Sequence, residues 1–413
     1  MSSALIRLEL KPGLGRHLKA GHPWVFKRGL EQVPRIPAGS VVDLTEGGRF
    51  MARGYYDPLS AIAVRVLTRD PGEVIDAAFF ARRVKECWDA RHALIDLTDT
   101  DSFRVVHGEG DGLPGVVVDH YAGWAVMKLY SAGLTPYRPL LVEALKAAIP
   151  KLKGIVGRDE VVRDDDADDA RGTGKILWGT PAPETIPILE RGTRFLVDVY
   201  RGQKTGFFLD QRENRALIKR LAKGHDVLNC FCFSGGFSVN AALGGAKSIF
   251  SVDQDEDAIA LARENFTLNG IDPSRFDFLA ADVFTLLDSF KQEGRTFDLI
   301  VLDPPAFAKS QKDVQAALDG YASLNRQALR LLRPGGLLVT SSCSARITPD
   351  AFLGAIKEAA FNADTELALV EERYQPPDHP IRLQFPEGRY LKFLVLREVG
   401  SWSPKASSSN ARR

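Results

Sequence analysis

Apolar segments with the pattern of buried strands alternate with helix-like segments from about residue 185 to residue 397. The strand candidates are residues 227–231, 248–253, 276–279, 299–303, 336–341 and 390–397. The helix candidates between them are residues 237–244, 255–268, 284–292 and 314–332. Such alternation is typical of βαβ units, in which helices cover both faces of a parallel sheet. Residues 186–400 are therefore predicted to form an α/β domain.

Two further regions precede this domain. Short alternating segments broken by Gly and Pro lie at residues 4–10, 40–44, 50–56 and 61–66. They predict a small antiparallel β-barrel or sandwich over residues 1–73. Residues 74–185, with a charged helix and several strand candidates, predict a mixed α+β middle domain. Residues 401–413 are rich in Ser and poor in aromatic residues, which predicts a disordered tail.

Composition excludes several classes of function. Of the 413 residues, 45% are hydrophobic, yet no apolar run approaches the roughly 18 residues that a membrane span needs, so no membrane partner is expected. The net charge is +1, so any nucleic-acid site must be a local patch. The four cysteines form no Cys-x-x-Cys pair, which predicts no metal site and favours a reducing, cytoplasmic setting. Residues 1–12 lack the apolar segment of a signal peptide.

Basic and aromatic residues are interleaved in the first region. Trp24 and Phe26 stand among four cations, Arg16, Lys19, Lys27 and Arg28. Such a mixture can grip RNA, because bases stack on aromatic rings and cations meet phosphates. Alternatively, Trp24 and Phe26 plug the barrel and the cations are ordinary solvated surface, which is the interpretation that these residues alone favour.

Ligand-type residues follow the first three strands of the predicted α/β sheet. In open sheets of this kind, ligands bind beyond the carboxyl ends of the strands. The Gly-containing turn of residues 229–237 follows the first strand, but it does not match the Gly-x-Gly-x-x-Gly pattern for a dinucleotide. Asp253 ends the second strand in the position of a ribose-binding carboxylate, and Asp282 follows the third, where it could accept from an adenine amine.

The absence of a P-loop pattern narrows the class of ligand further. Neither residues 172–176 nor residues 202–205 complete the P-loop pattern, which argues against an NTPase. An adenosine-bearing ligand without a pyrophosphate remains, and this points to S-adenosylmethionine.

Candidate catalytic and base-binding residues follow the fourth and fifth strands. Asp303-Pro304-Pro305-Ala306-Phe307 leaves the sheet rigidly, so that Phe307 could stack on a planar base while Asp303 bonds its polar edge. A plain turn is the alternative for this motif. Cys343 lies just past the fifth strand, whereas Cys87, Cys230 and Cys232 are expected to be small buried apolar residues.

Several stretches together resemble a known family. They are residues 22–26, 110–115, 204–212, 228–231, 235–237, 303–305 and 342–344. The C-terminal part resembles a class I (Rossmann-like) methyltransferase. The full length resembles the RlmI-type bacterial 23S ribosomal RNA cytosine-C5 methyltransferases. The resemblance implies an N-terminal PUA domain that reads RNA, S-adenosylmethionine as cofactor and large-subunit ribosomal RNA as partner, and it leaves pairing into a homodimer open.

The resemblance and the strand-end positions agree on the cofactor residues. They are Asn229, Phe231, Ser234, Gly235, Gly236, Asp253 and Asp282, with Lys204 and Thr205, in a strand leading into the sheet, at the methionine carboxylate. The substrate residues implied are Trp24, Pro304, Pro305, Phe307 and Arg212. Arg212 is equally well interpreted as a surface cation or as a phosphate contact.

A mechanism follows as a hypothesis. Cytosine C5 is a poor nucleophile, so Cys343 is expected to add to C6 first, while Asp303 donates a proton toward N3. The target base must be unpaired or flipped out of its helix. The sequence does not identify the base that removes the C5 proton. Two alternatives remain open: an amino-methyltransferase acting on guanine or adenine, which needs no cysteine, and a non-catalytic RNA-binding assembly factor.

Overall fold

The computed structural model describes residues 6–158, 174–308 and 311–401. The chain divides into two compact units, which are described separately. The first comprises Met1–Gly192, Leu196–Asp210 and Pro376–Gly388, and the second Thr193–Phe195, Gln211–Gln375 and Arg389–Arg413. Of the predicted tail, residues 402–413 lie outside the described residues.

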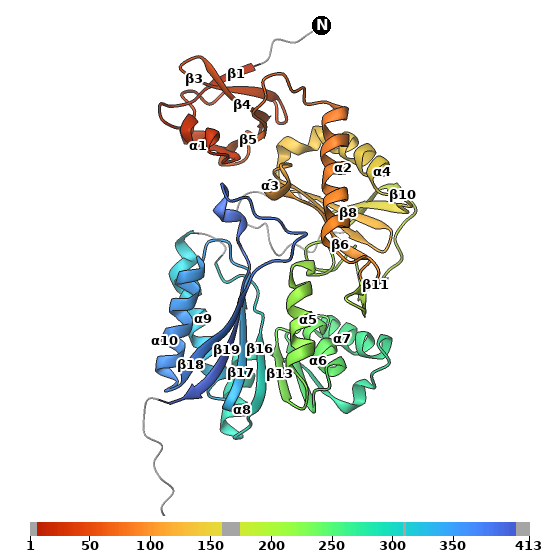
Figure 1. Ribbon diagram of the computed structural model, residues 1–413, viewed down its shortest axis with the longest axis vertical. Coiled ribbons are helices and arrows are strands. Elements are labelled where there is room, and N and C mark those ends of the chain that lie inside the picture. Colours follow the sequence, from red (N-terminus) through yellow and green to blue (C-terminus); the bar gives the residue numbers. More distant parts are fainter. Residues whose placement is uncertain (1–5, 159–173, 309–310, 402–413) are drawn as a thin grey trace, which may run out of the picture. The chain divides into compact units, whose positions relative to one another are not determined.

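A small five-stranded sheet opens the first unit (Figure 1). Its strands are β1 (Ile6–Glu9), β2 (Trp24–Phe26), β3 (Val41–Glu46), β4 (Arg49–Tyr56) and β5 (Ile62–Thr68), in the order β1-β3-β4-β5-β2, with helix α1 (Gly15–Lys19) beside them. The expected all-antiparallel pairing is wrong at one place, because β1 pairs with β3 in parallel. The long connection between these strands, which contains α1 and β2, allows the chain to cross over and return in the same direction.

A second five-stranded sheet forms the mixed α+β part. Its strands are β6 (Ser102–His107), β7 (Val116–Tyr121), β8 (Trp124–Leu129), β9 (Gly154–Gly157) and β10 (Lys175–Gly179), in the order β10-β9-β8-β7-β6. Helices α2 (Ala77–Leu94) and α4 (Arg138–Ala148) share its core, where Phe80, Val105 and Leu145 are fully buried. Helix α2 begins at residue 77 because the Asp76 side chain accepts a hydrogen bond from the Phe79 N–H and caps the helix. The hairpin of β11 (Ile186–Glu190) and β12 (Thr193–Val197) follows.

The second unit contains a seven-stranded sheet. Its strands are β13 (Asp226–Cys230), β14 (Ser248–Asp253), β15 (Asp277–Ala280), β16 (Phe297–Leu302), β17 (Leu332–Ser342), β18 (Glu366–Arg373) and β19 (Lys392–Gly400). Their order is β15-β14-β13-β16-β17-β19-β18, and β19 runs in the direction opposite to that of the other six strands. The order reverses between β13 and β16, which is where open α/β sheets bind ligands.

Six helices accompany this sheet. They are α5 (Arg212–Leu221), α6 (Gly236–Leu243), α7 (Glu256–Leu268), α8 (Val283–Gln292), α9 (Val314–Leu329) and α10 (Pro349–Asn362). Helices α5 to α7 lie on one face and α8 to α10 on the other (Figure 1). Leu228, Ile300 and Leu338 are fully buried between the helices, as expected for central parallel strands. No helix in the described ranges is both long and apolar enough to cross a membrane.

Candidate active site

The turn after β13 has a specialised backbone. Phe231, Phe233 and Gly235 have φ angles of 57°, 47° and 77°. This is the left-handed region, which costs a non-glycine residue about 1–3 kcal/mol, and such residues are enriched at functional sites. A Cβ atom on Gly235 would lie 2.9 Å from the Cβ atom of Ala262. The turn therefore requires glycine at 235, and it brings backbone groups to the switch point of the sheet.

Two buried oxygens at this turn are suited to a polar ligand. The Asn229 amide donates to Ser238 Oγ at 2.8 Å, which fixes the side chain. Asn229 Oδ1 and Ser234 Oγ are buried and have no hydrogen-bond partner within the described residues. Buried polar atoms are normally paired, so these two are available to a bound molecule. The residues thus fit the polar methionine and ribose groups of S-adenosylmethionine.

Asp253 is held against the same turn. Its carboxylate accepts hydrogen bonds from the backbone N–H groups of Phe233, at 2.9 Å, and Asp255, at 3.1 Å. Burial raises the pKa of Asp253. Each carboxylate oxygen accepts one of these bonds and can accept another. Asp253 can therefore receive both hydroxyls of a ribose.

We expect Asp253→Ala to weaken S-adenosylmethionine binding by about 10- to 100-fold, because hydrogen bonds to a charged group contribute about 1.5–3 kcal/mol. Isothermal titration calorimetry measures the affinity. Asp257→Asn, an exposed carboxylate in the first turn of α7, serves as the control and should bind normally. Equal affinities of the two variants would remove Asp253 from the cofactor site.

Asp282 is at the predicted position after β15, but the structure also gives it a local role. Its Oδ1 atom accepts from the Thr285 N–H at 2.9 Å and from Thr285 Oγ1 at 2.8 Å, so it caps α8. These hydrogen bonds lower the pKa of Asp282. The side chain is exposed. Its contact with an adenine amine stays a prediction.

Asp303 follows β16 and is the end of a chain of polar side chains that the sequence did not predict. Its Oδ1 atom accepts from Ser341 Oγ and, at 3.0 Å, from Gln211 Nε2. Asn214 in turn donates to Gln211 Oε1 at 2.6 Å, and Arg373 donates to Asn214 at 3.0 Å. Gln211 and Asn214 are 3% and 1% exposed. Because each amide oxygen accepts a hydrogen bond from the next residue of the network, the network fixes the orientation of the Asp303 carboxylate.

The two prolines after Asp303 differ in their exposure to solvent. Pro304 is buried and Pro305 is exposed. Phe307 is half-buried, with its ring centroid 4.7 Å from that of Tyr321. One side of the Phe307 ring therefore already has an aromatic neighbour, and stacking of a base on this residue stays a prediction.

The four cysteines differ in exposure as predicted. Cys87, Cys230 and Cys232 are buried, whereas Cys343 is partly exposed. Burial raises the pKa of each of the three buried thiols, so they stay protonated at neutral pH. Cys343 lies one residue beyond β17 and two residues beyond Ser341, the hydrogen-bond donor to Asp303. The structure thus brings the two proposed catalytic residues to adjacent strand ends.

Lys204 and Thr205 belong to the first unit, apart from the other proposed cofactor residues. They lie in a turn, and the expectation of a strand there is wrong. Thr205 is buried and donates to Asp119 Oδ2 at 2.5 Å, and Asp119 also pairs with Arg104 at 2.8 Å. These polar contacts satisfy the buried hydroxyl, so its position needs no ligand.

Arg212 is not a surface cation. Its side chain is 1% exposed and its Nε atom lies 3.1 Å from Glu213 Oε1. This excludes the simpler of the two interpretations of Arg212. Contact with an RNA phosphate stays a prediction for this residue.

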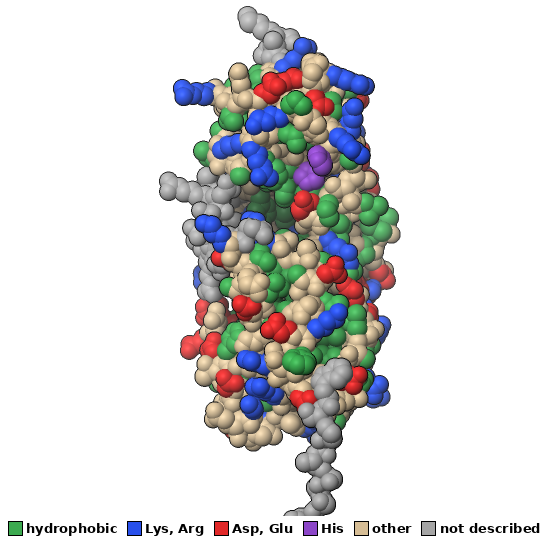
Figure 2. Space-filling model, turned by 90° about the vertical axis from the view of Figure 1, so that its left-hand side faces the viewer, with side chains coloured by type: hydrophobic (Ala, Val, Ile, Leu, Met, Phe, Trp, Pro, Cys, Tyr) green, Lys and Arg blue, Asp and Glu red, His purple; other side chains and the backbone are tan. Residues whose placement is uncertain are grey.

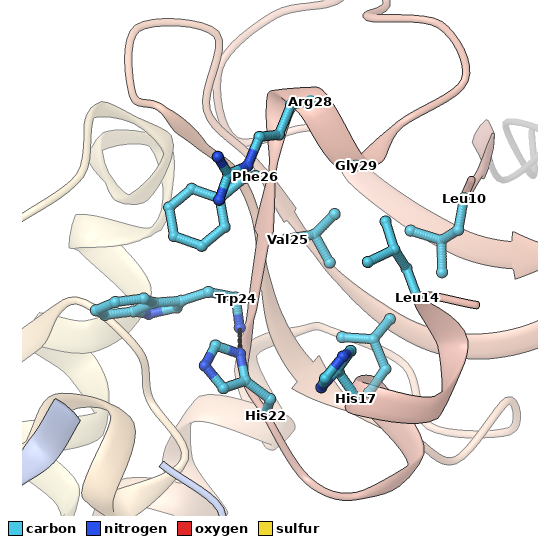
Figure 3. A pocket seen from close by; sticks show the side chains of 10 residues that line it. Leu10, Leu14, His17, His22, Trp24, Val25, Phe26, Arg28 and Gly29 are labelled. Atoms are coloured by element: carbon cyan, nitrogen blue, oxygen red, sulfur yellow. Dashed lines mark hydrogen bonds between the residues drawn. The ribbon is translucent and has the colours of Figure 1, made fainter. Parts of the chain in front are cut away.

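Trp24 and Phe26 do not plug the small barrel. On β2, Val25 is the residue that faces the core, while Phe26 is 37% exposed and Trp24 half-buried. Trp24 Nε1 donates to Glu109 at 2.8 Å. The guanidinium of Arg28 lies 5.6 Å from the centre of the Phe26 ring. These side chains border a pocket of about 440 Å³, together with His17, His22 and apolar residues (Figure 3).

The sheet order, the glycine-dependent turn and the strand-end carboxylates define the fold of a class I methyltransferase. A model of the S-adenosylmethionine-dependent methyltransferase family matches residues 106–395, and a PUA-like domain model matches residues 8–69. The ribosomal RNA large subunit methyltransferase I of Shewanella denitrificans is 43% identical over 398 residues, which cover 95% of this chain and 99% of that protein. The protein of the same name from Escherichia coli O157:H7 is 38% identical over 394 residues, with the same coverage. The chain belongs to the ribosomal RNA large subunit methyltransferase I family of S-adenosylmethionine-dependent enzymes.

Solved structures agree with this assignment. A putative SAM-dependent methyltransferase from Streptococcus mutans matches with a TM-score of 0.84 and 26% identity, over 95% of this chain and 100% of that one. A methyltransferase structure complexed with SAH matches equally well. The predicted fold class, family and cofactor are thereby confirmed.

Proposed function

We propose that this protein methylates C5 of a cytidine in large-subunit (23S) ribosomal RNA, in the cytoplasm, with Cys343 as a covalent nucleophile. The observation that carries the proposal is the placement of a partly exposed cysteine beside the Asp303 carboxylate, beyond a methyltransferase sheet. The name of the related enzymes specifies the RNA. The chemistry of the two side chains supports cytosine as the base and C5 as the methylated atom.

The reaction needs a nucleophile because C5 of cytosine does not attack a methyl sulfonium unaided. The Cys343 thiolate adds to C6, and the electron pair of the C5–C6 bond moves so that C5 becomes enamine-like. Asp303, when protonated, donates its proton to N3 and neutralises the charge that develops during the addition. After methylation, a base accepts the C5 proton, the C6–S bond breaks and returns the thiolate, and N3 gives its proton back to the Asp303 carboxylate.

The second unit supplies the proposed cofactor site. Asn229, Ser234 and the backbone at Gly235 would hold the methionine and ribose parts, and Asp253 the ribose hydroxyls. S-adenosylmethionine supplies the reaction with a methyl group on a positively charged sulfur. The thiolate and C5 must lie on the side of the sheet where these residues end their strands.

The pocket in the first unit is the proposed contact for flanking RNA. Phe26 is exposed beside the Arg28 guanidinium, and Arg16 and Lys19 are exposed on α1. Lys and Arg side chains are frequent over the N-terminal region in the upper part of Figure 2. An unpaired base can stack on the ring while the cations meet its phosphates. These cations form a local positive patch, although the net charge of the whole chain is only +1.

We expect Phe26→Ala to weaken binding of a large-subunit RNA fragment by about 5- to 100-fold, the usual contribution of one stacked base. Leu59→Ala is the matched control, since Leu59 is 68% exposed and does not line the pocket. Fluorescence anisotropy at fixed salt measures both affinities. Unchanged binding by the Phe26 variant would place the RNA elsewhere on the protein.

Nucleoside analysis tests the proposed reaction. Labelled S-adenosylmethionine is incubated with the protein and with 23S RNA or large subunits from cells that lack the modification. The proposal predicts labelled 5-methylcytidine. Labelled methylguanosine or methyladenosine would establish the amino-methyltransferase instead and reduce Cys343 to a packing residue. Absence of transfer to RNA and subunit alike would favour the assembly factor.

A further inference from the structure

A buried lysine lies directly beside the turn that carries Cys343. Lys392 is the first residue of β19 and pairs across the sheet with Ser342, the residue before Cys343. Its Nζ atom donates to the carbonyl oxygen of Ser344, the residue after Cys343, at 2.6 Å, and to that of Tyr390 at 2.7 Å. The side chain is 1% exposed. The backbone of Lys392 thus pairs with the residue before Cys343, and its ammonium group is held against the residue after it.

The charge is costly at this place, which makes a structural explanation insufficient. Lys392 is followed by Phe393, Leu394, Val395 and Leu396, all buried. A buried cation without a carboxylate partner loses several kcal/mol of hydration, whereas an apolar side chain of the same length would pack here without that cost. Burial lowers the pKa of Lys392 to about 8, and attraction to the Cys343 thiolate opposes that shift. Lys392 therefore combines a hydrogen bond to the turn with an electrostatic attraction to Cys343.

We propose that Lys392 is a positioning residue that activates Cys343: its ammonium group stabilises the thiolate and fixes the turn from which the sulfur attacks C6. This role rests on the proposed function, in which Cys343 is the nucleophile. Cations next to a cysteine commonly favour the thiolate in this way. The step itself moves one proton, from the Cys343 thiol to solvent, before the C–S bond forms.

Three other ionisable groups among the described residues stand near Cys343. Asp303 approaches from β16 through Ser341, and when it is ionised its negative charge opposes the thiolate. Tyr321 of α9 contacts Ser344 Oγ at 3.2 Å, and because burial raises its pKa to about 12, it is neutral at working pH. Arg346 is exposed, three residues further along the chain. Lys392 is the buried cation of this group, and it faces the turn directly.

The pH dependence of Cys343 alkylation tests this role. The full-length protein is treated with iodoacetamide between pH 5 and 10, and the rate at Cys343 is followed by mass spectrometry of its peptide. We expect a wild-type midpoint below about 7.5, against about 8.5 for an ordinary cysteine. Lys392→Met should raise the midpoint by about one unit or more, Lys392→Arg should largely restore it, and Lys357→Met, at an exposed lysine of α10, should not change it.

Two results would overturn the role of Lys392. One is a wild-type midpoint at or above about 8.5. The other is an unchanged midpoint in a Lys392→Met protein that still binds S-adenosylmethionine. If Lys392→Met does not fold, the alkylation midpoints of the wild type and of Lys392→Arg test the role of Lys392 instead. Alkylation requires no RNA, so it tests the role of Lys392 independently of methyl transfer. An active Cys343→Ala enzyme would refute Cys343 as the nucleophile. An ordinary alkylation midpoint together with an inactive Cys343→Ala enzyme would refute only the role of Lys392.

Discussion

Cys343→Ala is expected to abolish methyl transfer to large-subunit RNA, with kcat reduced by at least about 10⁴-fold, as when other enzymes lose their nucleophile. Without the sulfur, C6 receives no electron pair and C5 stays unreactive. Binding of S-adenosylmethionine should be unchanged, because the proposed cofactor residues lie on other strand ends. Single-turnover transfer of labelled methyl and calorimetry measure the two effects.

The control for this variant is another cysteine. Cys87→Ala removes a buried thiol from the first unit and should retain turnover at a temperature where it is folded. The Cys87→Ala variant is expected to be less stable than the wild type, because the substitution leaves a small cavity in the core. A Cys343→Ala protein that still formed 5-methylcytidine at more than about a tenth of the wild-type rate would contradict the nucleophile assignment.

Asp303→Asn is expected to lower kcat by about 10²- to 10⁴-fold, which is the range for loss of a general acid, with little change in the KM for RNA. The amide oxygen can still accept from Gln211 and Ser341, so the local hydrogen bonds survive. The amide can also donate toward N3, but it cannot transfer a proton. The variant thus separates proton transfer from positioning.

Steady-state kinetics at several RNA concentrations provide the measurement. Asp319→Asn, at an exposed carboxylate of α9, is the matched control for charge and should behave like the wild type. A raised KM with an unchanged kcat would mean that Asp303 only binds the substrate. An Asp303→Asn enzyme of full activity would remove it from the mechanism.

The central strands of the large sheet were predictable from the sequence because they are buried on both faces and therefore mainly apolar. Strand β18 was not, since its side chains are largely exposed and its segment, Glu-Leu-Ala-Leu-Val-Glu-Glu-Arg, carries no clear alternation. The parallel pairing of β1 with β3 also escaped prediction, because strand direction depends on the path of the connection. The α10 segment was likewise not predicted as a helix.

The site was predictable to the extent that strand ends meet at one edge of a sheet. This rule brought Asp303 and Cys343 together. It could not find Gln211 or Asn214, because their contacts join residues far apart in the sequence. Lys392 did leave a signal: it is a charged residue directly before the apolar run Phe393–Leu396, a pattern that is costly unless the charge has a use.

Trapping of the covalent intermediate tests the central claim most directly. In RNA with 5-fluorocytidine at the target, fluorine replaces the C5 proton, so the C6–S bond cannot break after methylation and the enzyme stays attached. We predict a denaturation-resistant protein–RNA adduct that requires S-adenosylmethionine, maps to the Cys343 peptide and is absent with Cys343→Ala. Methylation of the natural RNA without any adduct on the fluorinated RNA, or an adduct that persists in Cys343→Ala, would contradict the account.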